Sequence, residues 1–138
     1  MFIRLQIRDP MARFVAHDEY LQAGFARDSL FLVEAQQRGS RLEIIVERND
    51  DTKFCLIFKG ILFSCCAELD SFERTAGNDY LFDWNCITGN FGELFDSRLM
   101  SSFLPRSDVD PESCHHYFLA TYDDIFNIIA ESVSIEAI

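Results

Sequence analysis

Apolar and polar residues alternate in several short segments of this chain, as in strands with one buried face. The alternation is present from Phe2 to Ile7, and again from Leu30 to Gln36 and from Leu42 to Glu47, two segments joined by a glycine turn. A β-prone run, KFCLIFKGILFS, extends from Lys53 to Ser64, and Gly60 in its middle predicts a bulge or bend. The last three segments predict an antiparallel meander.

Helical signals are fewer. The Asp-Pro pair at residues 9 and 10 predicts a helix start, with the aspartate as N-cap and the proline in the first helical position, and the helix would include Phe14 and Leu21. The apolar spacing from Leu94 to Phe103 approximates a second short helix, which Pro105 would end.

The C-terminal segment fits two structures. Its β-branched and aromatic residues favour a hairpin of His116 to Thr121 and Ile125 to Ala130, followed by a strand from Val133 to Ile138. The apolar spacing from Ile125 to Val133 also fits a helix, and we favour the hairpin. We therefore expect one α+β domain over residues 1–138, with a strongly twisted antiparallel sheet of about five to seven strands and one or two short helices.

Composition favours a folded cytoplasmic domain. Nearly half of the 138 residues are hydrophobic, including 14 phenylalanines, which argues against disorder. The start of the chain is too charged for a signal peptide, and no apolar run approaches the roughly 18 residues that cross a membrane. The five cysteines, an odd number without a regular spacing, predict reduced thiols, and Cys55 is interpreted as a small core residue.

Charge changes this picture, because it is unevenly distributed. Residues 1–60 hold nine acidic and nine basic side chains, whereas residues 61–138 hold fourteen acidic side chains and three arginines, which gives the net charge of −11. A field of one sign repels nucleic acid and anionic lipid and attracts cationic surfaces. We therefore expect a basic protein partner, with no nucleic acid and no membrane.

Catalytic and cofactor signatures are weak. Cys114, His115 and His116 are adjacent, and alternate side chains of a strand face opposite sides, so they do not form a zinc site; we expect a strand start with one half-exposed histidine. No nucleophile motif or phosphate-binding loop is present, and the aspartates near residue 110 lack the rest of a calcium loop. We expect no cofactor, no metal and no enzyme.

The acidic, aromatic stretch of residues 68–112 is the candidate interface. Tyrosine and tryptophan are frequent in interface hot spots, and carboxylates around them steer a basic partner. A solvated loop with the tryptophan in the core is the alternative. The candidate partner-binding residues are Asp79, Tyr80, Asp83, Trp84, Glu93, Asp96, Asp108, Asp110 and Glu112.

The run HHYFLATYDDIFNIIAESVSIE resembles the closing segment of many small bacterial proteins, and FKGILF resembles their central strand. Some members of this loose group look like immunity proteins of polymorphic or contact-dependent toxin systems. The resemblance covers about a third of the chain, and no functional residues are carried over from it. It implies a protein that occludes a toxin.

Two function classes follow. The first is an acidic cytoplasmic immunity protein, monomeric or homodimeric, that neutralises a basic toxin such as a nuclease by occlusion. The second is a small enzyme or ligand-binding protein with a pocket near His115 and His116. A third, structural alternative is an oligomer whose sheet edges pair.

Overall fold

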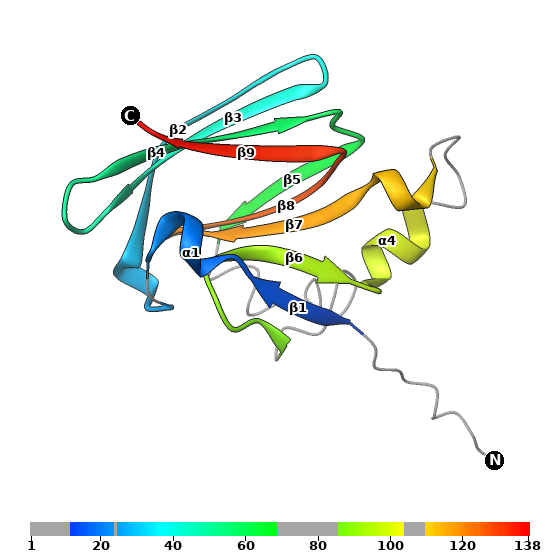
Figure 1. Cartoon of the computed structure of the whole chain (residues 1–138), viewed down its shortest axis with the longest axis horizontal. Helices are drawn as coiled ribbons and strands as arrows, with labels where there is room; N and C mark the ends of the chain where they lie inside the picture. Colours follow the sequence, from blue (N-terminus) through cyan, green and yellow to red (C-terminus); the bar gives the residue numbers. More distant parts are fainter. Residues whose placement is uncertain (1–11, 24, 69–85, 104–109) are drawn as a thin grey trace.

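Nine antiparallel strands form two sheets in the computed structural model, which describes residues 12–23, 25–68, 86–103 and 110–138 (Figure 1). Two short helices and two 3-10 turns connect them. The elements are β1 (Arg13–Ala16), α1 (Asp18–Leu21), η2 (Arg27–Ser29), β2 (Leu30–Arg38), β3 (Arg41–Arg48), β4 (Lys53–Lys59), β5 (Phe63–Glu68), β6 (Phe91–Phe95), α4 (Arg98–Phe103), η5 (Pro111–Ser113), β7 (His115–Ala120), β8 (Asp124–Ala130) and β9 (Ser132–Ala137).

The four-stranded sheet has the order β2-β3-β4-β9 and contains the predicted meander. Leu42, Ile44 and Val46 of β3 are buried on one face, as their alternation predicted. The register of β2 against β3 shifts between Leu32 and Glu34, which leaves a bulge in the edge strand.

The five-stranded sheet has the order β1-β6-β7-β8-β5, and its adjacent interior strands β7 and β8 form the predicted C-terminal hairpin. The hairpin prediction is confirmed, as is the strand that follows it, and the alternative helix is wrong. Almost every residue of β7 and β8 is buried, because both faces of this sheet are covered by side chains.

A bent ribbon joins the two sheets. β4 and β5 continue one another through Gly60, and β8 and β9 continue one another through Glu131, whose N–H donates to the carbonyl oxygens of Lys59 and Gly60. Gly60 has a φ of 67°, and an added Cβ would lie 2.6 Å from the Glu131 side chain. The prediction of one sheet is therefore wrong, because the chain forms two sheets that meet at this bend. In such β-sandwiches, strands that pass from one sheet into the other form the corners.

The main core lies between the two sheets. Phe58 of β4 packs edge-on or tilted against Phe91 and Tyr117, and these rings join the apolar residues of β3 and β8. A smaller core covers the opposite face of the five-stranded sheet, around Leu94 and Phe118.

Two helix predictions need correction. Residues Arg13–Ala16 form β1, because they pair with β6, and Phe14 packs edge-on against Phe118. The predicted helix from Leu94 starts only at Arg98, because Leu94 and Phe95 belong to β6. Long-range pairing outweighs local spacing in both places. The strand predicted at Phe2 to Ile7, the Asp-Pro helix start and Pro105 lie outside the described residues.

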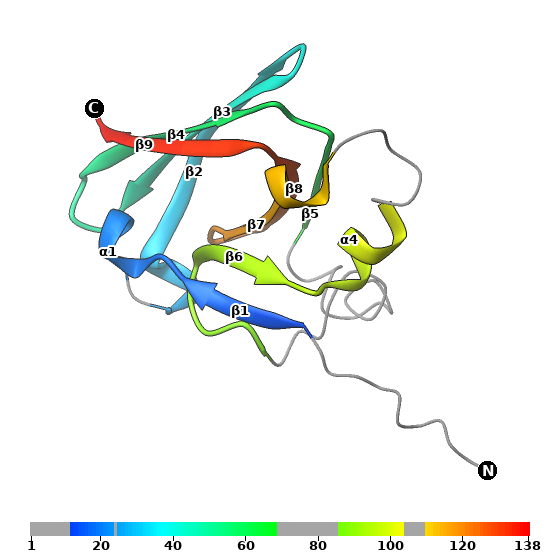
Figure 2. The ribbon, with the colours of Figure 1, turned by 45° about the vertical axis from the view of Figure 1, so that its right-hand side comes forward.

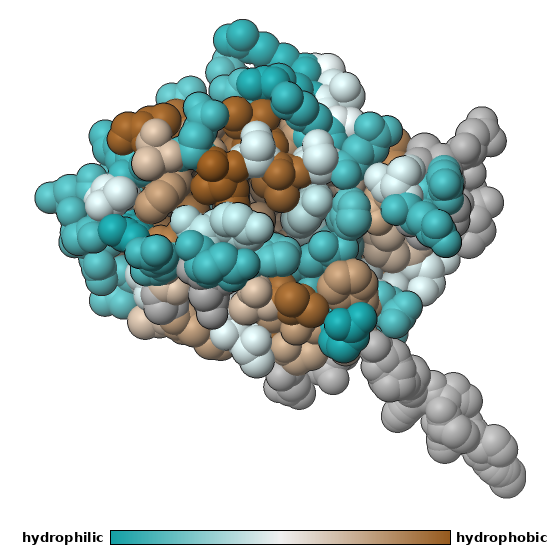
Figure 3. Space-filling view, in the orientation of Figure 1, coloured by the Kyte–Doolittle hydropathy of each residue, from teal (hydrophilic) through white to brown (hydrophobic). Residues whose placement is uncertain are grey.

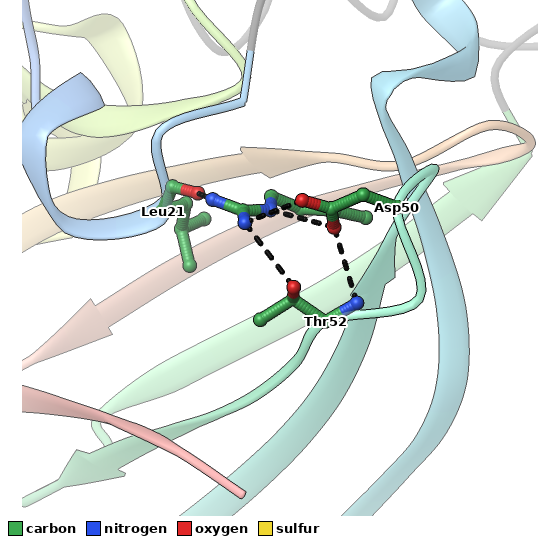
Figure 4. A network of polar contacts seen from close by, with 4 residues as sticks. Leu21, Asp50 and Thr52 are labelled. Carbon is green, nitrogen blue, oxygen red and sulfur yellow. Dashed lines mark hydrogen bonds and ion pairs between the residues drawn. The ribbon is translucent and has the colours of Figure 1, made fainter.

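Arg48 connects α1 to the β3–β4 turn (Figure 4). Its guanidinium donates to the carbonyl oxygen of Leu21 at 3.1 Å, to both carboxylate oxygens of Asp50, and to the hydroxyl of Thr52. It also lies 5.4 Å from the centre of the Phe54 ring. One side chain thus ties a single-turn helix to the sheet.

Across the described segments, no helix has the length and apolar character needed to cross a membrane.

Candidate functional site

A pocket of about 680 Å³ lies at one end of the five-stranded sheet. Its walls come from the end of β6, the start of α4, η5 and the start of β7, which meet there because β6 and β7 pair antiparallel. The lining residues are Glu93, Leu94, Phe95, Asp96, Met100, Ser101, Glu112, Cys114, His115 and His116.

Glu93 and His115 are hydrogen-bonded to each other in this pocket. Glu93 lies opposite Tyr117 in the register, so His115 is its diagonal neighbour on the same face. The carboxylate oxygen Oε2 lies 2.7 Å from the imidazole Nδ1, with 14% of the glutamate side chain and 36% of the histidine side chain exposed. His115 is therefore the half-exposed histidine predicted at the strand start.

His116 points to the opposite face and is fully buried. Its Nε2 lies 2.8 Å from Oδ1 of Asn127, and its Nδ1 lies 2.7 Å from the hydroxyl of Ser97, which accepts the N–H of Met100. Because the amide oxygen can only accept, Nε2 carries the ring proton and the serine hydroxyl donates to Nδ1. Burial lowers the pKa of His116 to about 4, against the opposing effect of the Asn127 hydrogen bond.

This Ser97, His116 and Asn127 network differs from a catalytic triad. The amide oxygen of Asn127 takes the place that a carboxylate has next to the imidazole of a triad, and Ser97 is fully buried. Ser97 instead caps α4, which begins at the next residue. The network anchors α4, one wall of the pocket, to the central strands of the sheet.

The thiol of Cys114, which lines the pocket, is held in its neutral form. Burial is the main cause that raises the pKa of the Cys114 thiol, and its sulfur donates to the Asp110 carbonyl oxygen at 3.6 Å. Tyr117, next to Glu93 and His115, has its pKa raised to about 12 by burial and by the negative charge of Glu93. These groups favour a binding role for the pocket over nucleophilic chemistry.

The pocket brings together three of the predicted partner-binding residues. Glu93, Asp96 and Glu112 line it, although they come from different elements. Asp110 adjoins it, since its carboxylate accepts the N–H of Glu112 at 3.0 Å. The remaining predicted residues, Asp79, Tyr80, Asp83, Trp84 and Asp108, lie outside the described residues.

One other described acid of the second half lies near the pocket, because the charge of Glu131 helps to raise the pKa of the Cys114 thiol. Glu68 pairs with Asp124 in the register at the opposite end of the five-stranded sheet, and Asp123 there forms an exposed ion pair with Arg27 at 3.3 Å. Carboxylates therefore lie at both ends of this sheet, and Glu136 is exposed on β9 of the other sheet.

Sequence reasoning did not identify Ser97 and Asn127 as partners of His116. Asn127 has a recognisable signal, because it is the single polar side chain in the apolar run IFNIIA. Ser97 has the weaker signal of an N-cap residue before an apolar helix.

Metal binding finds no support within the described part of the chain, which contains no group of three or more His, Cys, Asp or Glu side chains that could hold an ion. None of the five cysteines forms a disulfide, as predicted, and Cys55 is buried in β4. Comparisons with protein-family models, curated proteins and solved structures find no match to this chain.

Proposed function

We propose that this chain is a binding protein that neutralises a basic protein partner, in the manner of an immunity protein, by accepting a cationic side chain of the partner at the acidic pocket. The observation that carries this proposal is the hollow bounded by Glu93, Asp96 and Glu112. The net charge of −11 and the resemblance of the C-terminal third to immunity-type proteins support it.

Each carboxylate has a distinct place in this binding mode. Glu93 is mostly buried and oriented by His115, so it is held in position before a partner arrives. Asp96 and Glu112 are exposed at the rim, where they would steer a cation during the encounter. A planar guanidinium suits such a site, because it can donate to two carboxylate oxygens at once.

Among the described residues, two arginines lie close to the lining of the pocket. Arg98 opens α4, two residues after Asp96, and Arg13 lies over the Phe95 ring at 4.4 Å. Among the described lining residues, the two histidines are the only basic side chains. Burial keeps one of these, His116, neutral at physiological pH.

The test is co-expression of this chain with the protein encoded by each adjacent gene. We expect one basic product to arrest growth alone, to be tolerated together with this chain, and to co-purify with it. The variant Asp96→Asn/Glu112→Gln should reduce protection and co-purification. If no adjacent product is both toxic and bound, the proposal is wrong.

A matched control is available in the four-stranded sheet. Glu34→Gln/Asp51→Asn makes the same change in net charge on exposed residues, and Asp51, like Asp96, has a positive φ that asparagine tolerates. This control should protect as well as the natural sequence. Equal loss in both variants would show that overall charge, and not the pocket, determines binding.

A small-molecule site is the second candidate, favoured by the hydrogen bond between Glu93 and His115 inside the same pocket. A carboxylate that orients a half-exposed imidazole can bind a polar ligand or transfer a proton. A small ligand that raises the melting temperature of the natural chain, but not that of His115→Gln, would support this candidate.

A further inference from the structure

β9 forms an open edge of the four-stranded sheet. It pairs with β4 along its whole length and ends the strand order. Figures 1 and 2 both show β9 on the outside of the molecule. Figure 3, in the orientation of Figure 1, shows hydrophobic residues where β9 crosses the upper part of the view. Val133 and Ile135, although packed against the core, are only partly buried.

The backbone groups that face outward from β9 can be assigned. The N–H of Ile138 donates to the carbonyl oxygen of Lys53 on β4 at 3.0 Å. In an antiparallel strand the N–H and C=O groups of alternate residues point to the same side. Ser132, Ser134 and Glu136 therefore bond to β4, and Val133, Ile135 and Ala137 point their N–H and C=O groups away from it.

β9 also lacks the features by which edge strands avoid association. Its sequence, SVSIEA, contains no proline and no lysine, its register against β4 is unbroken, and its charged residue, Glu136, is exposed. By contrast, the edge strand β2 is interrupted by the bulge after Leu32, and the edge strand β1 has only four residues. The edge strand β5 leads directly into residues outside the described part.

We infer that β9 pairs with β9 of a second copy of this chain, around a two-fold axis at Ile135, to form an eight-stranded sheet. In this register Ile135 lies opposite Ile135 of the second copy, and Val133 lies opposite the second copy's Ala137. These are the residues whose N–H and C=O groups point outward, so every pair can exchange hydrogen bonds.

Side chains match in the same register. Val133, Ile135 and Ala137 share the face of β9 that covers the core, so apolar residues meet apolar residues across the axis. On the other face Ser134 lies opposite the second copy's Glu136, where the hydroxyl can donate to the carboxylate. No two like charges oppose one another. This self-complementarity identifies a second copy as the occupant of the edge.

Analytical ultracentrifugation over a wide concentration range tests the inference. Because the paired segment is short, we expect a weak dimer that dissociates on dilution. The measured mass should therefore approach twice the 16.0 kDa of one chain at high concentration and fall to that of one chain at low concentration. A mass of one chain at every concentration would overturn the inference.

The variant Ala137→Pro removes one outward N–H, leaves the bonds to β4 in place and changes an exposed side chain. It should be monomeric with an unchanged circular dichroism spectrum. Dimerisation at natural strength in this folded variant would exclude β9 as the interface.

A charge exchange tests the register and does not depend on proline. Ser134→Glu places a glutamate opposite the second copy's Glu136 twice per dimer and should weaken dimerisation about tenfold. Ser134→Glu/Glu136→Lys should restore it, because opposite charges then meet. Failure of Ser134→Glu to weaken the dimer, or of the double variant to restore it, would overturn the register. None of these residues lines the pocket, so the outcome is independent of the proposed partner.

Discussion

His116 is a buried base whose neutral form is part of the fold. Its ring is enclosed by Ser97, Asn127 and the smaller core, and burial lowers its pKa from 6.5 to about 4. Between these values the unfolded chain takes up a proton and the folded chain does not. Stability is therefore complete above about pH 6.5 and decreases as the pH falls towards 4.

We predict that the free energy of unfolding decreases on the order of 3 kcal/mol through this histidine between pH 7 and pH 4. Urea denaturation at a series of pH values measures it. His116→Gln should flatten this dependence, whereas His17→Gln, which lies outside the network, should retain it. An equal slope in both variants would contradict the assignment.

Asp50 provides a second pH-dependent contact, at the surface. Hydrogen bonds from Arg48 and Thr52 lower its pKa from 3.8 to about 2. A depressed carboxyl pKa stabilises the fold above about pH 4, and this stabilisation is lost as the pH falls towards 2. Asp50→Asn should therefore show a shallower loss of thermal stability across this acidic range than the natural sequence. A loss of equal steepness would show that the contact in Figure 4 contributes nothing.

At the scale of elements, local patterns predicted single strands better than their partners. The alternation in β3 and the hairpin of β7 and β8 were recognisable because each depends on neighbouring residues. The pairing of β1 with β6 joins segments far apart in the sequence, and no local signal carries it. For the same reason the sequence showed Glu93 and His115 as separate candidates and did not show that they contact each other, since the β6–β7 register brings them together.

Gly60 lies at the bend where the chain passes from β4 in one sheet to β5 in the other. Gly60→Ala should lower the free energy of unfolding by about 1–2 kcal/mol, because alanine is strained in the left-handed backbone conformation of residue 60. The total loss should be larger than this, because the new Cβ would also crowd the side chain of Glu131. Gly39→Ala is the matched control, because Gly39 has a similar φ of 60° and no atom within 4 Å of an added Cβ. Chemical denaturation should show the larger loss at Gly60. A loss no larger than that at Gly39 would contradict the crowding at the corner.

At the scale of the whole molecule, most of the described carboxylates of the second half lie at two ends of the five-stranded sheet, and Glu136 is exposed on β9 of the other sheet. The pocket end combines negative charge with a concave surface and an anchored helix. The predicted interface at Asp79 to Trp84 stays a prediction, whereas Glu93, Asp96 and Glu112 now have a common location. The open edge of β9 is separate from the pocket. One molecule can therefore bind a second copy of the chain at β9 and a basic partner at the pocket.

The most direct test of the account is the salt dependence of partner affinity, measured by isothermal titration calorimetry with the basic partner identified by co-expression. Charges at the rim of an interface are screened by salt, with a Debye length of about 10 Å at 0.1 M. We predict that affinity decreases steeply with added salt for the natural chain and for Glu34→Gln/Asp51→Asn, and much less for Asp96→Asn/Glu112→Gln. Affinity that is the same at low and high salt, or equally steep curves for both double variants, would contradict recognition at the acidic pocket.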